Sequence, residues 1–282
     1  MKIEHVIVPT DFSEASVNAM RFGAAIARKK EAKLSLLHVY ERPYTTTAYN
    51  GGLSATVDSV WSNEIRQEAI KDLRKLAKDE AVSGLDPKAI LVADKPTWEF
   101  HEDIQGDGNL IVMGTTGMTG VIHGGLFGTN TERTIRYSPF PVLSVPKECE
   151  FDKIDRILFA TDFKGEIHQA VDTLVNLAKI FDAEIQVGLI NTSDTYLSNR
   201  EAMKSFDELV EEVKYDKMQL VIYNAEDVAE GIREFSEERD VDLIAMVTHG
   251  RKGMSHFFKG SLTEDVSATI RTPLLAMKYD TK

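Results

Sequence analysis

Short runs of apolar residues alternate along the chain with longer stretches in which apolar residues recur every three or four positions. The runs are typical of buried strands, and the longer stretches are typical of helices with one buried face. Ahead of residues 15–28, where Ala15, Ala19 and Phe22 share one face, Ser13 is a suitable helix N-cap. In the first half the pattern predicts strands near residues 3–8, 34–39, 89–93, 109–113 and 141–145. It predicts helices near residues 15–28, 63–76, 97–104 and 131–137.

The second half repeats this pattern. It predicts strands near residues 155–160, 184–190, 217–222, 241–247 and 273–277, and helices near 166–181, 198–214, 226–238 and 261–271. The amino-acid sequence itself also repeats. Residues 5–12 (HVIVPTDF) align with 156–163 (RILFATDF) at an offset of 151, and 110–113 (LIVM) align with 243–246 (LIAM) at an offset of 133. Residues 141–145 (PVLSV) align with 273–277 (PLLAM) at an offset of 132. Such self-similarity indicates a tandem duplication.

The duplication predicts two domains, residues 1–147 and 152–280, joined by a short charged linker. The fall in offset from 151 to 133 means that the first half carries an insertion, and the polar residues 45–54 are the candidate. We expect this insertion to be an unstructured surface loop; the alternative is a lid over a site.

Alternating strands and helices indicate stacked βαβ units. The fold class that we predict is therefore α/β, with two doubly wound domains. Each is a five-stranded parallel sheet in the order 3-2-1-4-5, Rossmann-like, with helices on both faces.

Charge and cysteine content narrow the range of partners. The formal net charge of −12 argues against nucleic acid and anionic membranes, both of which attract basic surfaces. No apolar run is long enough to cross a bilayer. The single cysteine, Cys149, cannot form an internal disulfide, and we expect a cytoplasmic protein.

Residues 113–135 (MGTTGMTGVIHGGLFGTNTERTI) form a glycine-rich loop after the fourth predicted strand. Gly114 and Gly117 allow backbone amides to approach a ligand, and Gly128 with Thr129 opens a helix whose first amides favour an anion. In a 3-2-1-4-5 sheet the first and fourth strands are neighbours, so Asp11 and Gly114 border one crevice. Asp11 is placed to accept hydrogen bonds from ribose or adenine. The pattern therefore predicts a nucleoside phosphate ligand.

These features together resemble the universal stress protein family: a Thr-Asp after the first strand, Gly-x-x-Gly at 114–117, Gly-Thr at 128–129, and the closing PVLSV. The resemblance covers both halves. It implies adenine nucleotide binding (ATP, or AMP or ADP, with Mg²⁺ as an option), a role in the stress response, and pairing of the two halves through their last strands. We also expect two chains to associate as a homodimer.

The nucleotide contacts of that family fall, by position, on residues at the strand ends and in the glycine loops. In the first half they are Pro9, Thr10, Asp11, Val39, Met113, Gly114, Gly117, Gly128, Thr129 and Asn130. In the second half they are Thr161, Asp162, Ile190, Met246, Gly250, Gly260 and Ser261. Both halves depart from the pattern. The first loop is one residue longer, and Val247 replaces the first glycine of the second loop, where we expect its side chain to enter the space of the nucleotide.

We expect a nucleotide-binding regulatory protein with little or no turnover. The alternatives are an interaction scaffold without nucleotide and a slow ATP hydrolase, for which the sequence offers no evident base. Asp11 and Asp162 could instead be phosphoryl acceptors, but a matching lysine motif is absent. The histidines His38, His123, His249 and His256 lack paired metal-ligand spacing, so we predict no metal site and no catalytic residues.

Overall fold

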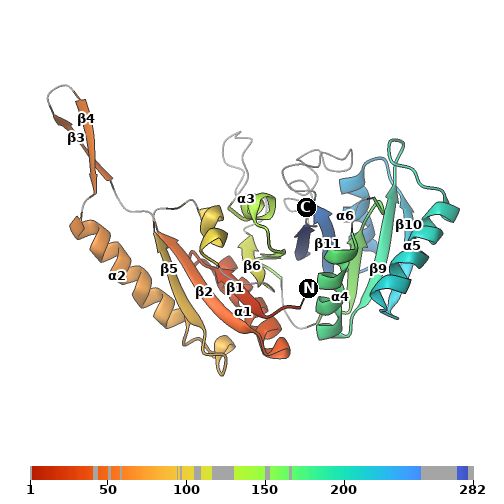
Figure 1. The fold of residues 1–282 in the computed structure, drawn as a ribbon, viewed down its shortest axis with the longest axis horizontal. Helices are drawn as coiled ribbons and strands as arrows, with labels where there is room; N and C mark the ends of the chain where they lie inside the picture. The colour runs from red at the N-terminus through yellow and green to blue at the C-terminus, as the bar shows by residue number, and fades with distance from the viewer. Residues whose placement is uncertain are drawn as a thin grey trace.

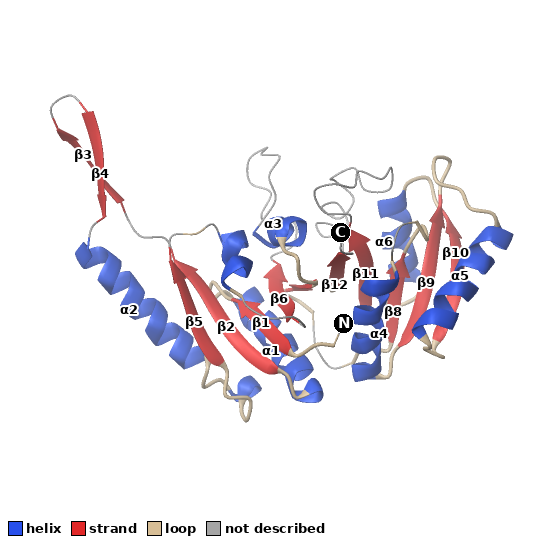
Figure 2. Ribbon diagram, in the orientation of Figure 1, coloured by secondary structure: helices blue, strands red, loops and turns tan. Residues whose placement is uncertain are grey.

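The apolar runs of the sequence form one continuous ten-stranded sheet that spans both halves (Figure 2). The structure is a computed structural model. It describes residues 2–40, 44–49, 52–57, 59–93, 95, 97–104, 109–115, 130–149, 153–164, 167–248 and 272–278.

Each half contributes five parallel strands to this sheet. Those of the first half are β1 (His5–Pro9), β2 (Lys33–Tyr40), β5 (Lys88–Ala93), β6 (Asn109–Thr115) and β7 (Val142–Pro146). Those of the second are β8 (Arg156–Ala160), β9 (Glu184–Asn191), β10 (Met218–Asn224), β11 (Leu243–Thr248) and β12 (Leu274–Lys278). The order across the sheet is β10-β9-β8-β11-β12-β7-β6-β1-β2-β5. Within each half this is the predicted 3-2-1-4-5 order, which is therefore confirmed.

The helices cover both faces of the sheet, and alternate strand residues supply the two cores. Of the longer helices, four pack on one face: α1 (Glu14–Lys30), α2 (Ser59–Leu76), α4 (His168–Phe181) and α5 (Asn199–Val213). The other face carries the 3₁₀ segment η2 (Thr97–Asp103), α3 (Asn130–Tyr137) and α6 (Val228–Glu238). A second 3₁₀ segment, η1 (Glu80–Val82), follows α2.

Strand β1 illustrates how alternation builds the cores. Val6 and Val8 pack with Phe22 of α1, whereas Ile7 faces the other way and packs with Phe100 of η2. All of these side chains are almost fully buried. Burying a side chain such as Phe22 contributes roughly 1.5–3 kcal/mol. The inner strands of the sheet are therefore buried on both faces, which is why they read as continuous apolar runs, whereas the edge strands β5 and β10 are only partly buried.

The two halves join through their last strands, as the family resemblance implied. Strand β12 pairs antiparallel with β7, with Leu275 opposite Leu143, at the centre of the sheet (Figure 2). Helices α1 and α4 also meet, where Lys29 Nζ donates to the Ile180 carbonyl at 3.3 Å. One buried cluster includes residues of both halves, so the interface is part of the hydrophobic core.

The insertion at residues 45–54 is not an unstructured loop, and that expectation is wrong. Strands β3 (Tyr44–Tyr49) and β4 (Gly52–Val57) pair antiparallel as a separate two-stranded sheet. Figure 1 shows this hairpin projecting away from the main sheet, beyond the end of β5 and α2.

One predicted helix takes a different form. The short helix expected at residues 97–104 is instead the 3₁₀ segment η2, which begins at Thr97 and ends at Asp103. The predicted helix at 261–271 lies outside the described residues.

Candidate functional site

The turn after β1 forms the first wall of the candidate site. Hydrogen bonds within the turn hold it: the Phe12 amide donates to Thr10 Oγ1 at 3.0 Å, and the Ser13 amide donates to Asp11 Oδ1 at 3.0 Å. Phe12 adopts a positive φ of 64°, a conformation that few non-glycine residues take. Ser13 then caps α1 by accepting from the Ser16 amide, as the sequence predicted. The turn therefore directs Asp11 outward, into the region beyond the carboxyl end of β1.

Asp11 is an exposed carboxylate held in its ionised form. Partial burial acts to raise its pKa, but hydrogen bonds from the Ser13 side chain, the Ser13 backbone amide and the Ser16 side chain outweigh it. The pKa of Asp11 therefore lies below its ordinary value. An ionised carboxylate only accepts hydrogen bonds. Asp11 is thus suited to ligand hydroxyl or amino groups.

The end of β2 forms a second wall beside this turn. His38 Nδ1 donates to the Thr10 carbonyl at 2.7 Å, and the His38 and Phe12 rings lie with their centroids 4.6 Å apart. The histidine thereby fixes the turn to β2. Val39, the next residue, is half-buried and lines the space beside the turn after β1.

The end of β6 and the start of α3 form the third wall. Thr131, in the first turn of α3, donates from Oγ1 to the Gly114 carbonyl at 3.1 Å, which ties the helix to β6. The first amides of a helix have no intrahelical partners and attract anions. The helix start at Asn130 therefore provides the electropositive side of the site.

The three walls enclose a pocket of about 470 Å³. This volume is within the roughly 300–1,000 Å³ of typical small-molecule sites. Seven residues predicted from the sequence line it: Pro9, Thr10, Asp11, Val39, Met113, Gly114 and Asn130. Gly117, Gly128 and Thr129 lie outside the described residues. Residues about 100 positions apart along the chain thus meet where the first and fourth strands of the half lie side by side.

Sequence reasoning missed several lining residues. They are Ser13, Ala15, Ser16, Leu37, His38, Thr115, Thr131 and Arg133. Ser13 and Ser16 were recognisable as part of a serine-rich helix start, but only as caps or solvent-facing residues. Arg133 carried no signal, because its approach to the pocket depends on how α3 packs.

The turn after β8 in the second half has the same backbone design. The Phe163 amide donates to Thr161 Oγ1 at 3.0 Å, the Lys164 amide donates to Asp162 Oδ1 at 2.9 Å, and Phe163 has a φ of 58°. One difference changes the chemistry. Lys164 stands where the first half has Ser13, and its Nζ lies 3.9 Å from Asp162 Oδ2. The acidic group of the second turn therefore has a cation of its own chain beside it.

Helix α6 covers part of the second half that is open in the first. Ile190, the counterpart of Val39, is 1% exposed and belongs to the core cluster beneath α6. Gly231 of α6 permits this approach, since a Cβ there would lie 2.6 Å from Ile190 Cγ2. Met246 is likewise fully buried, and Gly250, Gly260 and Ser261 lie outside the described residues.

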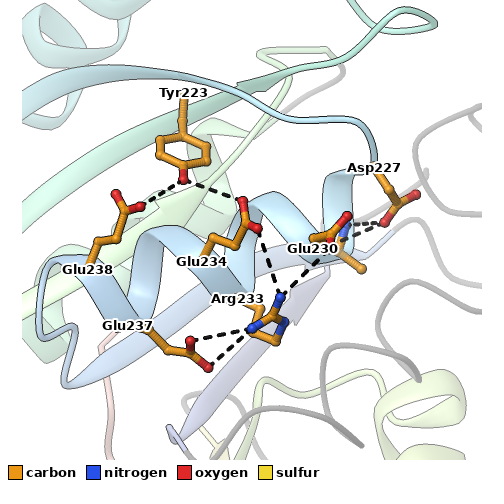
Figure 3. Close-up of polar contacts among 8 residues, drawn as sticks. Tyr223, Asp227, Glu230, Arg233, Glu234, Glu237 and Glu238 are labelled. Atoms are coloured by element: carbon orange, nitrogen blue, oxygen red, sulfur yellow. Dashed lines mark hydrogen bonds and ion pairs between the residues drawn. The ribbon is translucent and has the colours of Figure 1, made fainter.

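The outer face of α6 is strongly acidic (Figure 3). Arg233 lies 3.4–4.0 Å from Glu230, Glu234 and Glu237. The Tyr223 hydroxyl shares its single proton between carboxylate oxygens of Glu234 and Glu238, at 3.4 and 3.3 Å. Asp227 caps the helix by accepting from its first amides. These contacts join the side chains of α6 to one another and to Tyr223 of β10.

The two halves also differ at Gly114, whose counterpart in the second half is Val247. A Cβ at Gly114 would lie 2.4 Å from the carbonyl carbon and oxygen of Ala15, so the glycine is required by the close approach of α1. Val247 is 6% exposed and packed in the core, and the loop that follows it lies outside the described residues, so the expectation that its side chain enters the space of a nucleotide stays a prediction. Helix α4 begins at His168, three residues after the counterpart of Glu14 at an offset of 151.

Two further features bear on the chemistry. Among the described residues, no cluster of three or more histidine, cysteine, aspartate or glutamate side chains could hold a metal ion. None of the helices in the described part of the chain combines the length and apolarity needed to span a membrane.

Comparison with known proteins gives consistent matches over both halves. The model of the universal stress protein family matches residues 2–146 and again 153–278. A universal stress protein of Synechocystis sp. is 24% identical over 98% of this chain and 100% of its own length. One from Methanocaldococcus jannaschii is 33% identical over 50% of this chain and 81% of its own.

Solved structures match the fold. The crystal structure of a universal stress protein from Archaeoglobus fulgidus covers 99% of both chains with a TM-score of 0.71 and 18% identity. Two smaller structures align with 46% and 44% of this chain, at TM-scores of 0.37 and 0.35. They are a universal stress protein in complex with cAMP and one from A. fulgidus in complex with dAMP.

Proposed function

The chain belongs to the universal stress protein family, with two family domains in tandem, and we propose that it is a nucleotide-binding regulatory protein of the stress response. The ligand that we propose is an adenine nucleotide: ATP, ADP or AMP. Its site is the pocket of the first half, between the turn after β1 and the start of α3.

The observation that carries this proposal is the polarity of the pocket. Asp11, an ionised acceptor, lies on the side of β1 and β2, and the start of α3 lies on the side of β6. A nucleotide has donors at its base and ribose and negative charge at its phosphates. The Asp11 side of the pocket matches the donors of the base and ribose, and the α3 side matches the negative phosphates.

The same residues favour binding over turnover. Asp11 and His38 are the only lining residues in the described part of the chain that could act as a base. Both belong to the side that we assign to the nucleoside. Phosphate hydrolysis needs a base or a water-positioning group near the phosphates. Mg²⁺, if it participates, arrives with the phosphates in this proposal.

We assign the nucleotide to the first half. In the second half Lys164 lies beside Asp162, and Ile190 is buried beneath α6, so two of the matching positions differ in charge or access. The second half then serves as the structural partner. As part of the same proposal, the protein is cytoplasmic and two chains form a homodimer, which sedimentation equilibrium at micromolar concentration tests.

Asp11 and Asp162 provide a matched pair for the test. Both are strand-end aspartates in the same hydrogen-bonded turn. We expect Asp11→Ala to weaken ATP binding by about tenfold or more, because a charged acceptor is lost. We expect Asp162→Ala to leave ATP binding within about twofold of wild type.

Calorimetric titration of the full chain measures both affinities, and mass spectrometry of freshly purified, denatured protein shows any nucleotide carried through purification. A wild-type protein that neither retains nor binds adenine nucleotides would contradict the proposal, and would leave the interaction scaffold as the function. Equal losses in both variants would contradict the assignment to the first half.

A further inference from the structure

The pocket contains one arginine whose role the preceding argument leaves open. Arg133 lies in α3, one turn after Asn130, and lines the pocket. Its guanidinium carbon is 4.4 Å from the centroid of the Trp98 ring, which belongs to η2. Both side chains are half-buried. The packing of η2 against α3 therefore gives this arginine a fixed platform beside the pocket.

The geometry suits anion binding. A guanidinium that uses its face on an aromatic ring keeps the N–H donors along its edge for a phosphate. Helical side chains also lean toward the helix N-terminus. Arg133 is thereby directed toward the same end of α3 whose backbone amides attract an anion. Among the described residues that line the pocket, Arg133 is the only lysine or arginine.

We infer that Arg133, oriented by Trp98, binds a phosphate of the nucleotide and sets the preference of this site for nucleotides over nucleosides. The inference rests on the proposed function and adds a residue to it. Arg133 contacts the ligand directly. Trp98 is a positioning residue, because it acts by holding the guanidinium.

The sequence confines this arrangement to the first half. At the offset of 132 that aligns Gly128 with Gly260, Arg133 corresponds to Asp265, a residue of opposite charge. Both tryptophans of the chain, Trp61 and Trp98, are in the first half. The charge that we assign to phosphate binding thus has no counterpart at the matching position of the second half.

Trp98 also provides a direct readout. In a Trp61→Phe background it is the single tryptophan of the full chain. We expect ATP and AMP to change its fluorescence, because a phosphate bound to the Arg133 guanidinium changes the contact of that group with the Trp98 ring. Adenosine, which has no phosphate, is expected to bind more weakly and to change the fluorescence less.

Substitution of Arg133 separates phosphate binding from nucleoside binding. We expect Arg133→Gln to raise the dissociation constant for ATP by about tenfold or more, while that for adenosine changes less than about twofold. Arg133→Lys should recover part of the loss, since it restores charge without the planar fork. Trp98→Leu should give an intermediate loss for ATP.

Arg136→Gln is the matched control. It removes the same charge from the same helix at an exposed position that does not line the pocket. We expect it to leave the ATP affinity within about twofold of wild type. Circular dichroism of each variant, together with retained adenosine binding, shows that the pocket is intact.

Three outcomes overturn the inference. If Arg133→Gln binds ATP as wild type does, or loses ATP and adenosine affinity equally, Arg133 does not bind phosphate, and the proposed function still stands. If the wild-type chain binds neither ATP nor AMP, the proposed function fails and this inference fails with it.

Discussion

Phe12 and Phe163 hold left-handed backbone conformations at matching places in the two halves, with φ values of 64° and 58°. A bulky residue in this region costs of order 1 kcal/mol or more. In each turn a threonine hydroxyl accepts from the phenylalanine amide, and an aspartate accepts from the residue after it. These side-chain contacts offset the strain, so each acidic group is positioned by its own turn.

His5 illustrates a different effect of a single residue, because it titrates near neutral pH. Its Nε2 is 2.8 Å from Ser35 Oγ, across the β1–β2 pairing. Burial, then the nearby charge of Lys33, and then Lys88 lower the pKa of His5 from 6.5, although a hydrogen bond with Asn109 opposes them. The folded protein therefore resists protonation of this ring.

The pH dependence follows from that direction. Since the folded pKa is below the unfolded value of 6.5, the unfolded chain takes up more protons as the pH falls below 6.5. The free energy of unfolding should then fall, and His5→Gln should lack this part of the loss. Urea denaturation of both proteins at pH 7.5 and pH 5.5 measures this difference, because all other titrating groups are common to wild type and His5→Gln. Equal losses in wild type and His5→Gln would contradict the expectation.

At the scale of elements, the start of α1 depends on a glycine in a neighbouring strand. Gly114 of β6 has no room for a Cβ, because the Ala15 backbone of α1 occupies that space. The start of α1 carries Ser13 and Ser16, which hydrogen-bond around Asp11. The position of α1 and the acidic wall of the pocket are thus set together.

We expect Gly114→Ala to displace the first turn of α1, to destabilise the protein by about 1–3 kcal/mol, and to abolish ATP binding in the first half. Denaturant unfolding and calorimetric titration measure the two effects. Val247→Ala is the control at the matching position: it removes buried methyl groups and costs about 1–2 kcal/mol, but should leave ATP binding unchanged. Normal ATP affinity in Gly114→Ala would refute the coupling.

The strands and most helices could be predicted because their periodicity is set by burial. The β3–β4 hairpin projects away from the main sheet and was not recognised from the apolar periodicity, although Asn50-Gly51 between two short segments is a hairpin signal. Residues 97–104 read as a helix, but so short a segment tightens readily into 3₁₀ geometry.

Asp11 was predictable from its place after the first strand, because the expected sheet order puts it beside Gly114, whereas Thr10 and Val39 were predicted only through the family resemblance. Arg133 and His38 reach the pocket only through packing against Trp98 and Phe12, which no local pattern encodes. The burial of Ile190 beneath α6 was hidden for the same reason.

At the scale of the whole molecule, the second half supports the helix that lines the pocket of the first. Lys278, the last residue of β12, donates from Nζ to the carbonyls of Arg136 and Ser138 at 2.7 and 2.6 Å. These carbonyls are at the end of α3, where a cation is favourable. The other end of the same helix lines the pocket.

We expect Lys278→Met to lower the free energy of unfolding by about 1–2 kcal/mol, because charge-assisted hydrogen bonds are lost, and to weaken ATP binding severalfold. Thermal and denaturant unfolding together with calorimetry test this. Lys147→Met is the control: it breaks a solvent-exposed ion pair with Glu14 and should lower the free energy of unfolding much less than Lys278→Met does. Unchanged ATP affinity in Lys278→Met would show that the two halves are energetically independent.

The antiparallel pairing of β12 with β7 places two covalently linked halves in the arrangement that two identical subunits would otherwise take. In a symmetric homodimer every substitution appears on both sides of the axis. Here each copy has been able to change alone, so an arginine at 133 and an aspartate at 265 coexist in one particle. A tandem duplication thus allows residues to change at the site of one half while the other half continues to pair with it through the central strands.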